Sequence, residues 1–159
     1  MELIIDSEHV DLDHLAEFLP SLNGLILDNS KIESFRDIGA SLRMLRMLSV
    51  ANCGIRELDG IGILLYLKEI RLAHNHISDL TPLAMHEYVE IVDLSYNALE
   101  DMNECAMLGT CAKLRQLDMR GNPFSLHDQN YRCEVCSLIP QVNCLLSSYK
   151  CSAYFLCIF

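Results

Sequence analysis

Positive charge is scarce in this sequence. Its 159 residues include 12 Lys and Arg against 22 Asp and Glu, and no Lys or Arg precedes Lys31. Binding to nucleic-acid phosphates requires a basic surface, so the formal net charge of −10 argues against a direct nucleic-acid partner. The acidic N-terminal end suits solubility or, alternatively, a basic protein partner.

Long apolar runs are also missing. The opening residues MELIID lack the features of a signal peptide, and GIGILLYL and AYFLCIF are shorter than the roughly 20 residues that cross a bilayer. We therefore expect a soluble, cytoplasmic chain without a membrane partner. Nothing indicates secretion, so we expect all eight cysteines to be reduced thiols, namely Cys53, Cys105, Cys111, Cys133, Cys136, Cys144, Cys151 and Cys157.

Catalytic motifs are scarce too. Gly60-Ile61-Gly62 lacks the third glycine of a dinucleotide loop, and no Ser or Cys stands in a recognised nucleophile context. One stretch, His74-Asn75-His76, resembles the core of a small metal-dependent nuclease site. The same asparagine has a second interpretation, as part of a structural repeat.

One group of cysteines has the spacing of half a zinc site. Cys133-x-x-Cys136 can hold one edge of a tetrahedral site, and Cys144 and Cys151 follow it. However, two cysteines three residues apart in a helix can simply pack, and the second pair lacks a tight spacing. We therefore expect no bound metal.

A repeat runs through most of the chain. The frame L-x-x-L-x-L-x-x-N-x-L occurs five times, with starts spaced by 23, 22, 22 and 25 residues. The matching segments are LNGLILDNSKI from Leu22, LRMLSVANCGI from Leu45, LKEIRLAHNHI from Leu67, VEIVDLSYNAL from Val89 and LRQLDMRGNPF from Leu114.

This pattern predicts an α/β solenoid. Each repeat forms a short strand with its apolar residues in the core, then turns and returns on the opposite side as a short helical turn. At the turn, the Asn side chain bonds to exposed backbone groups, and Ser or Cys is a weaker substitute. The predicted ladder residues are Ser30, Cys53, Asn75, Asn97 and Asn122. Because the ladder explains Asn75, the nuclease-like stretch His74-Asn75-His76 needs no catalytic role. We therefore expect that the protein is not an enzyme and binds no cofactor.

Both ends of the array require caps, because terminal repeats would otherwise expose the core. Residues 1–21 predict a strand and a helix that form the N-terminal cap, followed by five repeats over 22–124. In the segment 125–146, Tyr131, Val135, Leu138 and Ile139 have helical spacing before Pro140, which predicts a C-terminal cap. Residues 147–159 form an atypical apolar tail.

The frame resembles the leucine-rich repeat family, in its short class of about 22 residues per repeat. NYRCEVCSLIPQV is similar to the cap of intracellular members, among them a regulatory subunit of protein phosphatase 1, a spliceosomal protein and axonemal proteins. The resemblance implies a curved parallel sheet on the concave side, short helical turns on the convex side, and a protein-binding function.

Three details resemble a ciliary branch of this family. They are RDIGASL after the first repeat, Cys in place of Asn before GIRELDGI, and ISDLTPL. This resemblance implies a role in the cilium or flagellum, as an adaptor in dynein arm assembly or transport, with dynein arm or intraflagellar transport components as partners. A regulatory subunit of a Ser/Thr phosphatase and a ribonucleoprotein scaffold are the alternatives.

The strand residues between the buried leucines should form the concave face. The central column is Ile26, Ser49, Arg71, Asp93 and Asp118, flanked by Asp28, Ala51, Ala73, Ser95 and Arg120 and by Gly24, Met47, Glu69, Ile91 and Gln116. Apolar anchors within polar surroundings favour binding, although a solvated sheet face is the alternative. The predicted protein-binding residues of this monomer are Met47, Ser49, Glu69, Arg71, Ile91, Asp93, Ser95, Gln116, Asp118 and Arg120.

Overall fold

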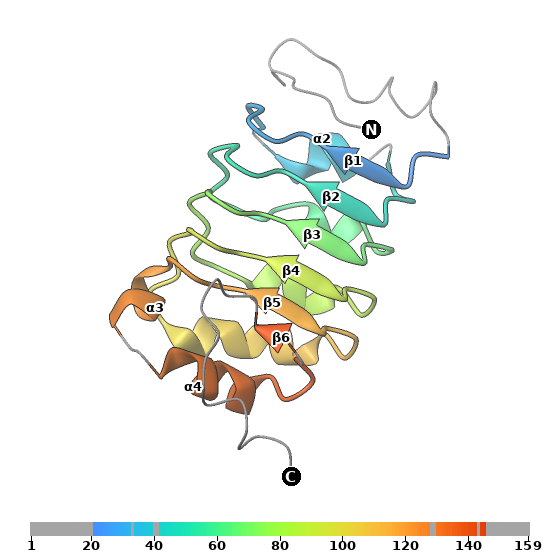
Figure 1. Cartoon of the computed structure of the whole chain (residues 1–159). Coiled ribbons are helices and arrows are strands. Elements are labelled where there is room, and N and C mark those ends of the chain that lie inside the picture. The colour runs from blue at the N-terminus through green and yellow to red at the C-terminus, as the bar shows by residue number, and fades with distance from the viewer. Residues whose placement is uncertain (1–20, 33, 40–41, 128–129, 143, 146–159) are drawn as a thin grey trace.

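The repeats stack into one parallel sheet (Figure 1). The computed structural model describes residues 21–32, 34–39, 42–127, 130–142 and 144–145. Its six strands follow one another in the order β1-β2-β3-β4-β5-β6. They are β1 (Gly24–Ile26), β2 (Met47–Ser49), β3 (Glu69–Arg71), β4 (Ile91–Asp93), β5 (Gln116–Asp118) and β6 (Cys144–Leu145).

The strands confirm the predicted frame. The register pairs Leu48 with Ile70 and Val92 with Leu117, so each apolar residue of the frame lies beside its counterpart in the next repeat. The middle residue of each of β1 to β5 is buried and its two neighbours are mostly half-buried. Stacking these middle residues produces one continuous core, because no single repeat can bury its own apolar face.

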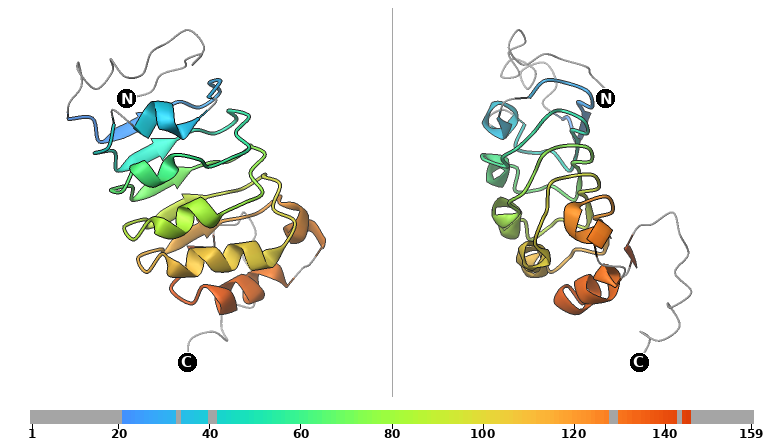
Figure 2. Two further views of the ribbon diagram at one scale, coloured as in Figure 1. Left: turned by 180° about the vertical axis from the view of Figure 1, so that it is seen from behind. Right: turned by 90° about the vertical axis from the view of Figure 1, so that its left-hand side faces the viewer.

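The returning segments form the opposite layer of the solenoid, as Figure 2 shows from behind and from the side. The predicted short helical turns are confirmed: α2 (Phe35–Gly39) is followed by the 3-10 helices η1 (Ile61–Ile63) and η2 (Thr81–Met85). η3 (Met102–Thr110) is longer, since the fourth repeat has 25 residues and the extra length extends this segment. The core residues that these segments contribute include Ile38, Leu42, Ile61, Leu64, Leu80 and Leu83.

The C-terminal cap contains the expected helix. α3 (Pro123–His127) is followed by α4 (Tyr131–Leu138), and the buried side chains of Val135 and Ile139 close the core. Leu138, the last residue of α4, has an exposed side chain. The cap also adds β6 to the sheet, a strand that the sequence pattern did not predict.

Some predictions lie outside the described residues. These are all but the last residue of the N-terminal cap 1–21, the tail 147–159, and the side chains of Cys144 and Cys151. Within the described part of the chain, no helix has the length and apolar character needed to cross a membrane.

Candidate protein-binding surfaces

The ladder residues bind the backbone at the turn after each strand. The Asn75 side-chain oxygen accepts hydrogen bonds from the Cys53 and Ile55 amides, both at 3.0 Å. Its Nδ2 donates to the carbonyls of Val50 and Leu72, both at 2.9 Å. One amide therefore joins two successive repeats, and Asn97 and Asn122 repeat the arrangement. The predicted ladder is confirmed at these three positions.

Cys53 occupies the same position with different chemistry. Its Sγ donates to the Leu27 carbonyl at 3.1 Å, which corresponds to the bond from Asn97 to Leu72. A thiol sulfur is a weaker acceptor than the Asn75 oxygen, and it receives the backbone amides of Asn29 and Ser30 in its place. Burial raises the pKa of this thiol to about 11, which keeps it protonated. Ser30, the first ladder residue, is buried as well.

The residue before each ladder position has a left-handed backbone. φ is between 55° and 72° at these five positions, which are Asn29, Asn52, His74, Tyr96 and Gly121. The His74 ring stacks on Tyr96 with centroids 4.5 Å apart, and a Cβ on Gly121 would collide with the Tyr96 ring. His74 is therefore part of a structural column, and the buried Asn75 between the two histidines is committed to the backbone. The nuclease interpretation is wrong.

Seven of the ten predicted binding side chains lie half-buried or exposed on the concave face. They are Met47, Glu69, Arg71, Ile91, Asp93, Gln116 and Arg120, and we call this set the concave strip. The sheet register places Ser49 beside Arg71, Arg71 beside Asp93 and Asp93 beside Asp118, so the predicted central column is correct in its alignment.

The remaining three side chains are buried, which corrects the expectation of a fully open face. The Ser49 hydroxyl donates to the Asp28 carboxylate at 2.6 Å, and the Ser95 hydroxyl donates to Asp93 at 2.7 Å. Asp118 is 1% exposed, and its carboxylate accepts from the Arg120 amide. Ser95 and Asp118 thus bond within the turn that follows their own strand, whereas Ser49 bonds to the turn of the preceding repeat. The Asp-x-Ser spacing of Asp93 and Ser95 is a sequence signal for such a turn.

Charged groups of the concave strip pair within their own repeat. The Arg71 guanidinium lies 2.6 Å from the Glu69 carboxylate, two residues earlier in β3. The Arg120 guanidinium lies 2.7 Å from the buried Asp118 carboxylate. Burial raises the pKa of Asp118, and the neighbouring Arg120 groups counteract it. The strip therefore presents arginines whose orientation is held by intramolecular carboxylates.

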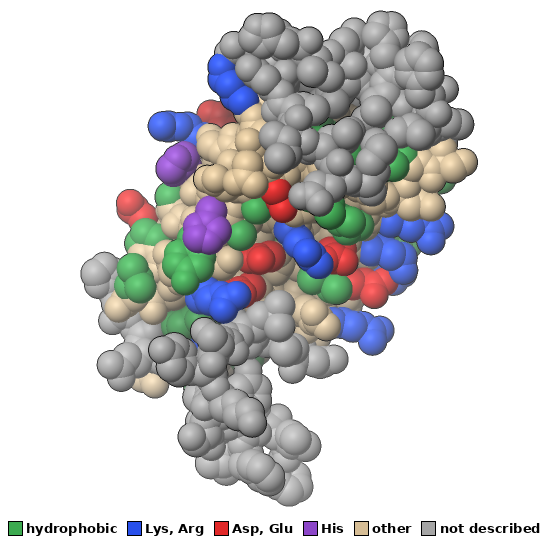
Figure 3. Space-filling model, turned by 45° about the horizontal axis from the view of Figure 1, so that its top comes forward, with side chains coloured by type: hydrophobic (Ala, Val, Ile, Leu, Met, Phe, Trp, Pro, Cys, Tyr) green, Lys and Arg blue, Asp and Glu red, His purple; other side chains and the backbone are tan. Residues whose placement is uncertain are grey.

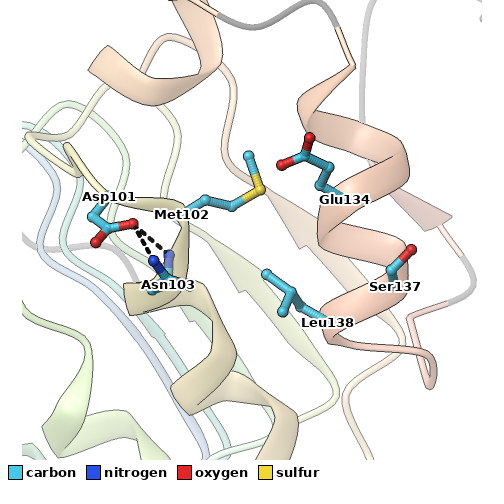
Figure 4. A pocket seen from close by; sticks show the side chains of 6 residues that line it. All are labelled: Asp101, Met102, Asn103, Glu134, Ser137 and Leu138. Carbon is cyan, nitrogen blue, oxygen red and sulfur yellow. Dashed lines mark hydrogen bonds between the residues drawn. The ribbon is translucent and has the colours of Figure 1, made fainter.

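An open cleft of about 470 Å³ lies between η3 and α4 (Figure 4). Asp101, Met102, Asn103, Glu134, Ser137 and Leu138 line it. The Asp101 carboxylate accepts bonds from the Asn103 amide and side chain, which lower the pKa of Asp101. This carboxylate is the N-cap of η3, so its position has a structural explanation.

The cysteines whose side chains the structure describes differ in their burial. Cys53, Cys105 and Cys111 are buried as small hydrophobes, and burial raises the pKa of Cys105 to about 12. Cys133 and Cys136 are more accessible. Among the described residues, no group of three or more His, Cys, Asp or Glu side chains is placed to hold a metal ion.

Curated relatives match most of the chain. Leucine-rich repeat-containing protein 56 of Rattus norvegicus is 39% identical over 156 residues, covering 91% of this chain and 28% of the relative. The human protein of that name is 38% identical over the same share of this chain, and a Trypanosoma brucei homolog is 30% identical over 72% of it. The chain thus spans less than a third of the length of these relatives. No family model matches it.

Solved structures with the same architecture include an internalin of Listeria monocytogenes. Its TM-score is 0.66 at 19% identity, covering 81% of this chain and 36% of the internalin. A leucine-rich repeat protein of Leptospira interrogans has a TM-score of 0.58 at 20% identity, covering 80% of this chain and 38% of that protein. At these identities the likeness establishes the fold alone.

Proposed function

The chain belongs to the leucine-rich repeat family, and on that premise we propose that it is a non-enzymatic module that binds a protein partner through the concave strip. Leucine-rich repeat relatives support a protein-interaction module as the general function. Solenoids commonly use their concave surface for this purpose, because stacked repeats form an extended rigid face.

The observation that carries the proposal is the prearranged chemistry of the strip. Arg71 has a side chain that is 55% exposed, yet its guanidinium is held by Glu69. Half-buried Met47 and Ile91 provide apolar contact area on neighbouring strands. Side chains that are already ordered lose less entropy on binding, which favours recognition.

The finer proposal concerns the partner and the location. The ciliary resemblance of RDIGASL, of Cys53 before GIRELDGI, and of ISDLTPL supports a monomeric adaptor that works in the cytoplasm and cilium or flagellum. Its partners would then be dynein arm or intraflagellar transport components. The curated relatives carry the name of one protein in mammals and in a trypanosome, which supports a function shared among them.

A capture experiment tests both levels. The chain is immobilised, incubated with an extract of ciliated cells, and the retained dynein arm, intraflagellar transport and phosphatase subunits are quantified by mass spectrometry. Arg71→Glu should reduce capture of the partner by roughly tenfold, because it places a carboxylate where the partner meets an arginine. Arg56→Glu, which reverses an exposed charge outside the strands, is the matched control and should capture normally.

The identity of the captured protein separates the candidates. Retention of dynein arm or transport components that depends on Arg71 supports the adaptor. Retention of a Ser/Thr phosphatase, or of ribonucleoprotein subunits, would replace it with a regulatory subunit or a scaffold. If neither Arg71→Glu nor Arg56→Glu changes the amount of captured protein, the concave strip is not the binding surface.

A further inference from the structure

A second surface lies on the edge of the sheet where the chain enters each strand. The residues just before the strands are exposed there and belong to neither the core nor the concave strip. We call them the leading edge, defined by Arg43, Met44, Arg46, Tyr66, Lys68, Tyr88, Lys113 and Arg115.

Backbone hydrogen bonds hold one column of the leading edge in register. The Lys68 amide donates to the Arg46 carbonyl at 2.8 Å, the Glu90 amide to Lys68 at 2.7 Å, and the Arg115 amide to Glu90 at 2.9 Å. Successive side chains of this column are therefore one strand spacing apart, about 4.8 Å. The four positions from Arg46 to Arg115 extend over about 14 Å at that spacing.

Exposed aromatic rings form the adjoining column, two residues earlier in each repeat. Tyr66 and Tyr88 are 50% and 43% exposed, with ring centroids 6.3 Å apart. Lys113 Nζ lies 4.5 Å from the centre of the Tyr88 ring, and Met44, in the same column, is 56% exposed. Four of the nine large hydrophobic side chains that the described structure leaves exposed, including Leu65, lie three or four residues before a strand. Solvent-facing aromatic and apolar side chains in contact with one another mark interaction surfaces.

The leading edge is basic although the chain as a whole is acidic. Five of the twelve Lys and Arg residues lie on it. Its one intervening carboxylate, Glu90, is bonded by Lys68 Nζ at 2.8 Å. Lys68 chiefly, with Arg115 and Lys113, lowers the pKa of Glu90, which reports a positive local field. Figure 3 shows several Lys and Arg side chains close together along the right-hand edge of the molecule.

We propose that the leading edge binds a short acidic segment of another protein in an extended conformation. Its Asp or Glu side chains meet Arg46, Lys68 and Arg115, and one aromatic or aliphatic side chain packs on the pair Tyr66 and Tyr88. At about 3.3 Å per residue, the length of this column matches four to five residues of extended chain. The site lies beside the concave strip and goes beyond the function proposed for that strip.

The carboxylates around the leading edge limit the bound acidic peptide to a short segment. Glu69 borders the leading edge on the concave side, and Glu87 precedes Tyr88 on the other. Asp93 lies further along the concave face, beside Arg71. A long polyanion such as nucleic acid would extend over these carboxylates and be repelled, within a chain whose net charge is −10. A peptide of four or five residues covers the basic column alone.

The test uses an array of ten-residue peptides that place four Asp or Glu residues around one Phe, Tyr, Leu or Met. Peptides that bind the chain are then measured in solution by fluorescence anisotropy. Removing two charges in Lys68→Gln/Arg115→Gln should weaken binding by roughly tenfold, and Tyr88→Ala by a comparable factor. Added salt should weaken it further, because the charges are exposed. Circular dichroism and an unchanged melting temperature establish that each variant is folded.

Arg71→Glu is the matched control and should bind the peptides as the wild type does. It should lose the partner of the concave strip, whereas the Lys68→Gln/Arg115→Gln variant should keep it, so the two proposals fail separately. Absence of any acidic binder, or binding that survives all leading-edge variants, would overturn the inference. Tighter binding to single-stranded oligonucleotides or to vesicles with anionic lipids would also overturn it, in favour of another class of partner.

Discussion

The first two repeats and the following repeats are stabilised in different ways. In the first two, the ladder residues are Ser30 and Cys53, and the last buried position of the convex segment is Leu42 or Leu64. In the third repeat these positions hold Asn75 and His86, and in the fourth Asn97 and Cys111. The early repeats thus have a weakly bonding ladder residue and a large apolar side chain in the convex segment. The later repeats have a strongly bonding ladder Asn and a polar or smaller side chain in the convex segment.

This difference indicates that a repeat needs a sufficient total of stabilising contacts, and that its source can vary. Each repeat contacts only its neighbours, so stability is approximately a sum of local contributions. A buried Leu contributes apolar burial, whereas a ladder Asn prevents the loss from unpaired backbone groups. Substitutions that exchange these features between the two regions test the comparison.

The largest effect is expected from Asn75→Ala. This change removes an oxygen that accepts from Cys53 and Ile55 and a nitrogen that donates to Val50 and Leu72. Leaving several buried backbone groups unpaired should lower the free energy of unfolding by about 3–5 kcal/mol. Urea denaturation followed by circular dichroism measures the change.

Asn103→Ala is its matched control, because the exposed Asn103 side chain bonds only to Asp101 among the contacts of the described residues. We expect a change below about 0.5 kcal/mol there, in line with surface substitutions. Equal losses at the two positions would mean that the ladder is not what stabilises the later repeats.

A smaller, opposite effect is expected from Cys53→Asn. The amide keeps a donor for the Leu27 carbonyl, to which Sγ now donates at 3.1 Å, and adds an oxygen that can accept a backbone amide of the first repeat. The free energy of unfolding should rise by about 1 kcal/mol. Cys53→Ala supplies neither group, so its free energy of unfolding should be lower than that of the wild type. A Cys53→Asn protein less stable than Cys53→Ala would show that this turn cannot hold the larger side chain.

The smallest effect, and one that depends on pH, is expected from His86→Leu. His86 is buried, and neither ring nitrogen has a well-aligned hydrogen bond among the described residues. Burial lowers the pKa of its imidazole, and a contact with the Ile61 backbone only partly offsets the shift. The corresponding residue of the preceding repeat is Leu64, so leucine suits the site.

The direction of the pH dependence follows from this lowered pKa. In the unfolded chain, histidine titrates near its ordinary value of about 6.5 and binds the proton more readily than in the folded state. The contribution of His86 is therefore present above that pH and is lost as the pH falls through the folded value. Melting curves between neutral and mildly acidic pH should show wild type losing more stability than His86→Leu. Parallel losses in the two proteins would contradict this assignment.

The sequence predicted the strands and the core well, because both depend on the identity of residues at fixed spacing. Leu25, Leu48, Ile70, Val92 and Leu117 are the middle residues of five strands at the predicted offset in the frame. For the concave face, the sequence predicted which residues lie side by side but not which side chains are exposed. Ser49, Ser95 and Asp118 are short polar residues. Ser95 and Asp118 bond within the turn of their own repeat, and Ser49 bonds to the turn of the preceding repeat.

By itself, the sequence determined the period, the core and the Asn ladder, since apolar burial and backbone hydrogen bonding leave few alternatives for a 22-residue repeat. Only the tertiary structure decided which charges pair and which surfaces stay open. Arg71 meets Glu69, and the leading edge gathers Tyr66, Lys68 and Arg115 from three repeats. The leading-edge residues are about one repeat apart in the sequence, so they come together only once the strands are stacked. The Arg71–Glu69 pair lies within β3 and depends on the rotamers of the two side chains.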